Sequence, residues 1–153
     1  MEPAVSAGTI TAVLVVLVLP GAVASGWWLG GLPDLARVSV TGGTIRIVPR
    51  GVLRWLSFRP VLVLELGSVR AVSVAISAEL APAGLRSPAL AVPGLRAGTY
   101  RSAEAASYWL VGRAPRVVRL DLAGGPLDYV LLQVHDPEEL AGRLGAGLAL
   151  RPA

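Results

Sequence analysis

The sequence predicts an amino-terminal transmembrane helix followed by a mainly-β domain of about seven short strands and one carboxyl-terminal α-helix. Three observations predict this fold class: an uncharged apolar segment, a hydrophobic period of two after it, and a helix start signal near the end. Of the 153 residues, 54% are hydrophobic and only 16% are charged, against about 25% in a typical soluble domain. The apolar surplus lies in one segment, so we expect residues 1–33 to form an anchor and linker and residues 34–153 a separate domain.

The segment Ile10–Leu29 contains twenty uncharged residues. A helix of about twenty residues spans the roughly 30 Å hydrocarbon core of a bilayer, so this segment is long enough to cross once. Trp27 and Trp28 lie at its carboxyl end, where amphipathic indole rings favour the headgroup layer. Gly30, Gly31 and Pro33 then end the helix. We therefore expect the lipid bilayer to be a partner of the chain, with both tryptophans at the membrane interface.

A cleaved export signal is the alternative. Ala22-Val23-Ala24 before Ser25 has the small-x-small form that signal peptidase accepts, so cleavage after Ala24 would release an envelope β domain. Residues 1–9, however, contain no basic residue, whereas export signals normally begin with a positive region. The uncleaved anchor is the favoured interpretation.

Charge asymmetry predicts the orientation. No Lys or Arg precedes the apolar segment, whereas Arg37, Arg46, Arg50 and Arg54 follow it. Because positive residues near a membrane stay on the cytoplasmic side, we expect a single-pass protein of the cell membrane with a cytoplasmic carboxyl-terminal domain.

The strands are predicted by alternating apolar residues and by turn signals between them. Thr41-Gly42-Gly43-Thr44 is a hairpin signal, because Gly-Gly adopts the positive φ angles of a two-residue turn. Prolines and glycines within Ser77–Ala97 interrupt the period, so we expect a long loop there. The expected strand segments are Val38–Val40, Ile45–Ile47, Val61–Leu66, Val69–Ile76, Thr99–Arg101, Tyr108–Val111, Arg116–Leu122 and Leu127–Val134.

A helix start follows the last strand. Asp136 is a good N-cap and Pro137 suits the first helical position, with two acidic residues in the first turn. Leu140, Leu144 and Leu148 then recur every four residues and predict an apolar stripe that docks on a sheet.

The stretch from Arg37 to Leu144 resembles the pleckstrin-homology-like domains of small bacterial membrane proteins. The resemblance rests on the order and spacing of short motifs: Val38-Ser39-Val40, Ile45-Arg46-Ile47, Pro60-Val61-Leu62-Val63-Leu64, Gly94-Leu95-Arg96-Ala97-Gly98-Thr99-Tyr100, Tyr108-Trp109-Leu110-Val111, Val117-Val118-Arg119-Leu120 and Asp136-Pro137-Glu138-Glu139-Leu140. It implies a bent antiparallel sheet or partly open barrel capped by the carboxyl-terminal helix. Eukaryotic relatives that bind phosphoinositides have Lys and Arg around the first hairpin. Here only Arg46 is near that hairpin, which argues against such a site.

Arg50, Arg54 and Arg59 are candidate contacts for an anionic membrane surface, because Trp55 and Phe58 lie between them. The simpler interpretation is a solvated edge with two core or rim aromatic residues. A nucleic-acid partner is not expected, since the net charge of +4 is spread along the chain.

No catalytic set is evident. The chain has no cysteine and a single histidine, which excludes thiol chemistry and a histidine-based metal site. His135 and Asp136 are adjacent at a strand–helix junction and are not expected to face a common pocket. Trp109 and Tyr100 are expected in the core. We therefore predict a non-catalytic binding or scaffolding module with no cofactor, metal or small-molecule substrate, and with an unidentified protein partner.

Overall fold

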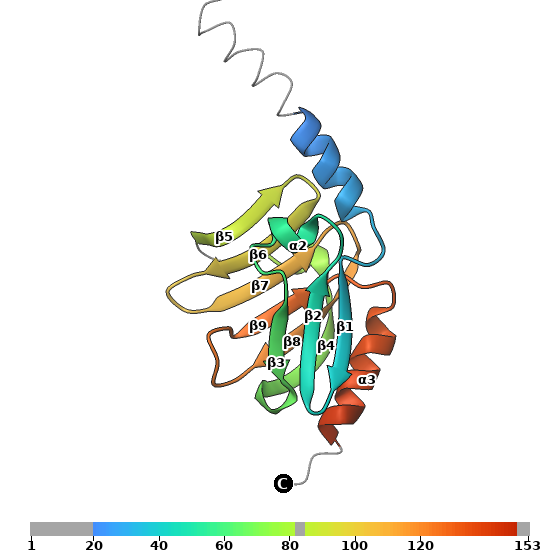
Figure 1. The fold of residues 1–153 in the computed structure, drawn as a ribbon, viewed down its shortest axis with the longest axis vertical. Coiled ribbons are helices and arrows are strands. Elements are labelled where there is room, and N and C mark those ends of the chain that lie inside the picture. Colours follow the sequence, from blue (N-terminus) through green and yellow to red (C-terminus); the bar gives the residue numbers. More distant parts are fainter. Residues whose placement is uncertain (1–19, 82–84, 150–153) are drawn as a thin grey trace, which may run out of the picture.

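The computed structural model describes residues 20–81 and 85–149, and it confirms a mainly-β domain with a carboxyl-terminal helix (Figure 1). Nine strands occur in these residues, rather than the expected seven or so, and they form two sheets. The first has the order β1-β2-β3 and consists of β1 (Ala36–Thr41), β2 (Thr44–Pro49) and β3 (Leu62–Glu65). The second has the order β4-β8-β9-β7-β6-β5 and consists of β4 (Val69–Ile76), β5 (Leu85–Val92), β6 (Leu95–Arg101), β7 (Ala106–Val111), β8 (Arg116–Leu122) and β9 (Tyr129–Leu132).

Residues 20–30, called the junction helix below, are helical and end at Gly30, as the glycine and proline residues predicted. Among the residues that the structure describes, no helix is both long and apolar enough to cross a membrane. The segment expected to span begins at Ile10, and its residues before Pro20 lie outside the described part of the chain. The transmembrane assignment therefore stays a prediction.

The first hairpin forms as predicted. Gly42 and Gly43 have φ angles of 57° and 78°, the positive values that a tight two-residue turn requires. After β2 the chain makes a short helix that the sequence did not predict, α2 (Leu53–Leu56). Figure 1 shows that the β1–β2 turn lies at one end of the molecule, whereas α2 and the junction helix lie at the other.

The expected loop Ser77–Ala97 is the main error of the sequence prediction. A 3-10 turn, η2 (Ser77–Glu79), is followed after the undescribed residues 82–84 by β5 and the start of β6. Proline is tolerated in β5 because this strand forms the edge of the six-stranded sheet. The register also shifts between Arg86 and Ala89, next to Pro88.

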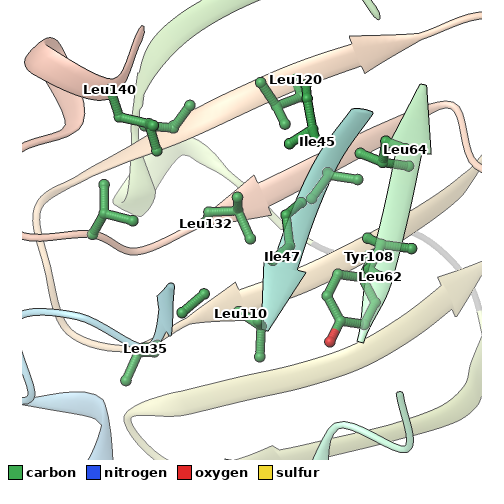
Figure 2. Packing of buried hydrophobic residues seen from close by; sticks show 14 of the residues in the cluster. Leu35, Ile45, Ile47, Leu62, Leu64, Tyr108, Leu110, Leu120, Leu132 and Leu140 are labelled. Carbon is green, nitrogen blue, oxygen red and sulfur yellow. The ribbon is translucent and has the colours of Figure 1, made fainter. Parts of the chain in front are cut away.

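The core lies between the two sheets (Figure 2). Ile45 and Ile47 of β2 share this core with Tyr108 and Leu110 of β7, and all four side chains are fully buried. The helix α3 (Pro137–Ala149) packs on β4 and β8 and adds Leu140 and Leu144 to this core, with Leu148 partly buried. The predicted leucine stripe and its docking are confirmed. Asp136 Oδ1 accepts the Glu139 backbone N–H at 2.8 Å, as expected of an N-cap.

A smaller apolar cluster contains Trp109 and Tyr100, which are almost fully buried as expected. Their rings meet edge to face at 5.8 Å between centroids. Because β4 and β5 lie at opposite edges of the sheet, the chain between them must cross a sheet face. Leu80 of this crossing segment packs against the cluster, and its carbonyl accepts a hydrogen bond from Arg96.

Candidate functional site at the helix junction

The junction helix is held against the domain by close glycine contacts. A Cβ atom on Gly30 would collide with the carbonyl oxygen of Gly94, and one on Gly112 would collide with the backbone of Gly30. Gly94 turns the chain between β5 and β6 with a φ of 81°. Gly30 and Gly112 require glycine because only a residue without a side chain allows the backbones to approach so closely, and Gly94 favours glycine because of its positive φ angle.

Gln133 binds both sides of this junction. Its side-chain amide Nε2 donates hydrogen bonds to the carbonyls of Gly30 at 3.1 Å and Leu32 at 2.6 Å. Its Oε1 accepts the backbone N–H groups of Gly112 at 2.8 Å and Ala114 at 3.1 Å. Gln133 is 1% exposed, so these four bonds satisfy a buried amide that would otherwise be costly. The end of the junction helix is thereby fixed to the loop between β7 and β8.

Arg113 adds a third contact. Its guanidinium lies 3.8 Å from the centroid of the Trp27 ring, a cation–π geometry, and its backbone N–H donates to the Gly30 carbonyl at 2.8 Å. Trp27 is still 54% exposed and Trp28 is 69% exposed. The two tryptophans predicted at a membrane interface are thus exposed, and Trp27 lies against the domain.

The short helix α2 and the residues next to it carry both buried and exposed apolar side chains. Leu53 points into the core and is 1% exposed, whereas Val52, Trp55 and Phe58 are 49%, 76% and 58% exposed. We call these last three residues the α2 apolar patch. Trp55 and Phe58 are therefore surface rather than core residues, a position that both sequence interpretations allow, and contact with an anionic membrane stays a prediction.

The structure separates the three candidate arginines. Arg50 forms an ion pair with Asp34 at 3.2 Å, beside a cavity between β1 and α3. Arg59 lines a different groove along β3. Arg54 lies on α2 next to the apolar patch. Only Arg54 thus shares its short helix with the exposed Trp55, and Arg50 is already paired.

The remaining polar groups have structural roles. Asp34 accepts the His135 backbone N–H at 2.7 Å with one carboxylate oxygen and Arg50 with the other. His135 and Asp136 do not form an acid–base pair: Asp136 caps α3. Within residues 20–81 and 85–149, no group of three or more acidic or histidine side chains is placed to hold a metal ion.

The hydroxyl of Tyr108 is buried in the core without a well-formed hydrogen bond. Burial raises the pKa of this hydroxyl above its ordinary value of 10.0, and the nearby Ser57 hydroxyl and Arg59 charge partly offset the effect. A phenol with a raised pKa is a poor acid or nucleophile at neutral pH, so it suggests no catalytic role.

Comparison with protein-family models, curated proteins and solved structures found no match to this chain. The pleckstrin-homology-like resemblance stays a prediction, and the function must be inferred from the chain's own residues.

Sequence reasoning did not identify Gln133, Arg113 or Val52. The one available signal was Gln133 itself, a lone amide within the apolar run Val130–Val134. A buried amide in such a run needs partners, but the sequence does not reveal that Gly30 and Leu32 supply them.

Proposed function

We propose that this protein is a membrane-tethered, non-catalytic binding or scaffolding module of pleckstrin-homology-like type, with its domain on the cytoplasmic face. Its partners are the lipid bilayer, through the amino-terminal segment, and a protein still to be identified. The observation that carries the proposal is the fixed junction between Gly30 and the domain. A flexible linker leaves a tethered domain free to rotate, whereas buried hydrogen bonds and glycine contacts hold it in one orientation.

The sequence before the junction supports a tether. The residues that precede the junction helix continue the uncharged run from Ile10, and exposed Trp27 and Trp28 are suited to the headgroup layer. A fixed junction at this point would set one end of the domain, the end that carries α2, against the bilayer surface.

The second candidate is an exported domain cleaved after Ala24, and the junction contacts do not depend on the residues that cleavage would remove. Gly26, Trp27 and Gly30, which contact the domain, all lie after the cleavage position. A cleaved chain beginning at Ser25 would keep these contacts, so the junction is compatible with both candidates.

Alkaline extraction of membranes from cells expressing the full chain separates them. The proposal expects the protein in the washed pellet with the mass of the uncleaved chain, 15.8 kDa. A soluble product that lacks residues 1–24 would establish the exported form instead.

A further inference from the structure

We propose that the α2 apolar patch, Val52, Trp55 and Phe58, inserts into the interfacial layer of an anionic phospholipid bilayer, with Arg54 binding lipid phosphates. This inference rests on the proposed function, since it adds a second membrane contact to the tether.

The three patch residues span α2 and its two ends: Val52 precedes the helix, Trp55 lies within it and Phe58 follows its C-cap, Ser57. They are spaced three residues apart, and each step is closed by a backbone hydrogen bond: Trp55 N–H donates to the Val52 carbonyl at 3.0 Å, and Phe58 N–H to the Trp55 carbonyl at 3.1 Å. Residues three apart in a helical turn lie near one another on its surface, which applies to Val52 and Trp55, whereas Phe58 follows the end of the helix with a positive φ angle. The patch is therefore a local group of three exposed apolar residues on a segment that the buried Leu53 anchors in the core.

The patch is part of a concentration of exposed apolar residues at one end of the molecule. Among the described residues, nine large hydrophobic side chains are exposed, and six of them lie on the junction helix or in the patch. All the exposed aromatic residues are in this set, namely Trp27, Trp28, Trp55 and Phe58. Tryptophan is the residue that most favours the boundary between lipid headgroups and acyl chains. Contiguous exposed apolar surface of this kind marks an interaction site.

The backbone at Phe58 supports a functional role for its exposure. Phe58 is the one described residue other than glycine with a positive φ angle, 55°. A bulky residue in this conformation is strained, and here burial of its ring does not compensate for the strain. Insertion of the ring into lipid would supply that compensation.

The charge around the patch is positive, so it favours contact with an anionic surface over contact with a neutral one. Between Asp34 and Glu65 the sequence contains no acidic residue, and the first turn of α2 has none. Arg54 is exposed beside Trp55, so an arginine lies next to the α2 apolar patch. Arginine binds phosphate oxygens through a planar fork of donors, and each basic residue near an anionic membrane contributes about 1 kcal/mol.

The position of α2 identifies the bilayer as the occupant. A groove of about 180 Å³ is lined by Ala22, Ser25, Gly26 and Leu29 of the junction helix, by Leu56 of α2, and by residues of β5 and β6. The two helices are therefore neighbours at the same end of the domain (Figure 1). The uncharged run Ile10–Leu19 precedes the junction helix in the sequence, so a tether through that run would bring α2, the neighbour of the junction helix, close to the same bilayer.

The test places a fluorescent probe at single cysteines in the full chain, which has no cysteine of its own. Val52→Cys reports on the patch, and Val40→Cys is its control. Both replace a valine of similar exposure, 49% and 43%, and Val40 lies on β1 toward the opposite end of the molecule. Each labelled protein is reconstituted in phosphatidylcholine vesicles with or without phosphatidylglycerol, some carrying nitroxide-labelled lipid, and its fold is checked by circular dichroism.

We expect nitroxide lipid to quench the probe at position 52 severalfold more than the probe at position 40, with a blue-shifted emission at position 52 only. Adding Trp55→Ser and Phe58→Ser is expected to abolish this difference. Arg54→Gln is expected to weaken it in phosphatidylglycerol vesicles and leave it unchanged in phosphatidylcholine.

Equal quenching at the two positions, in protein that survives alkaline washing, would overturn the inference and leave the tethered module standing. A blue shift at position 52 that grows with protein density and is insensitive to nitroxide lipid would mean a contact between copies, which also overturns it. Protein released by the alkaline wash would instead refute the proposed function.

Discussion

Gln133, which follows β9, donates a hydrogen bond from its buried side-chain amide to the carbonyl of Gly30, the last residue of the junction helix, at 3.1 Å. The two residues are 103 positions apart in the chain. This contact joins the segment that leads to the expected tether with the centre of the six-stranded sheet. It is the basis of the proposed fixed orientation.

Replacing Gln133 tests the strength of this junction. Gln133→Leu keeps the approximate volume but leaves the Leu32 carbonyl and the N–H groups of Gly112 and Ala114 without this partner, while the Gly30 carbonyl keeps only the Arg113 N–H; each buried unpaired group is costly. We expect the free energy of unfolding to fall by about 3 kcal/mol. Urea denaturation followed by circular dichroism measures the loss, and Ser73→Ala on the exposed face of β4 is the control. A loss no larger than that of the control would contradict the assigned role.

The close contact of Gly30 with Gly94 predicts that a substitution at Gly30 acts locally, at the end of the junction helix. Gly30→Ala places a Cβ against the Gly94 carbonyl, so the end of the junction helix must move away, at a cost of about 2 kcal/mol. The Arg113 N–H, which donates to Gly30, is expected to lose its protection from hydrogen exchange. Gly21→Ala in the same helix has open space around it and is expected to be neutral or slightly stabilising. Equal exchange behaviour in both variants would show that the close contact is not maintained.

We expect the stability of the domain at alkaline pH to depend on the ionisation of Tyr108. Burial raises the pKa of its hydroxyl in the folded protein above the unfolded value of 10.0. The unfolded chain therefore releases this proton first, and the stabilisation present below pH 10 is lost as the pH rises toward the folded pKa. Tyr108→Phe removes this contribution, so its urea midpoint is expected to fall less than that of the wild type between pH 8 and pH 11. Tyr129→Phe, at a partly exposed ring, should follow the wild type. Parallel pH profiles for Tyr108→Phe and the wild type would refute the assignment.

Asp34 and Arg50 form one ion pair, but we expect their substitutions to lower the stability of the domain by different amounts. Asp34 also accepts the His135 N–H, so Asp34→Ala removes a charged hydrogen bond to the backbone and is expected to cost about 2 kcal/mol. Arg50→Ala removes only a solvent-exposed partner and is expected to cost less than about 1 kcal/mol. Thermal denaturation of the two variants measures the order, and a larger loss for Arg50→Ala would reverse our interpretation.

The elements that were predicted correctly have local signals. The Gly42-Gly43 turn needs only its own φ angles, and α3 begins where Asp136 caps its own first turn. Strand β8 alternates from Val118 to Leu122 and was predicted with its observed bounds. In each case the sequence and the local hydrogen bonds favour the same conformation, so no distant residue is needed to define the element.

The elements that were missed depend on distant residues. Strand β5 contains a proline that is acceptable only because no further strand pairs with its outer edge. A four-residue helix such as α2 has no periodicity to detect, and packing of Leu53 maintains it. The junction was missed for the same reason, since its glycines and Gln133 come from four separate parts of the chain. The exposure of Trp55 and Phe58 could not be predicted either, because aromatic residues beside arginines are compatible with a core or a surface position.

The measurement that tests the central claim most directly is the accessibility of a single cysteine in cells. Ala103→Cys lies in the exposed turn between β6 and β7 and would be the only thiol in the chain. A membrane-impermeant maleimide is applied to intact and to permeabilised cells, and the alkaline-washed membrane fraction is then examined. The account predicts labelling only after permeabilisation, with the uncleaved chain in the membrane pellet. Labelling of intact cells would contradict it.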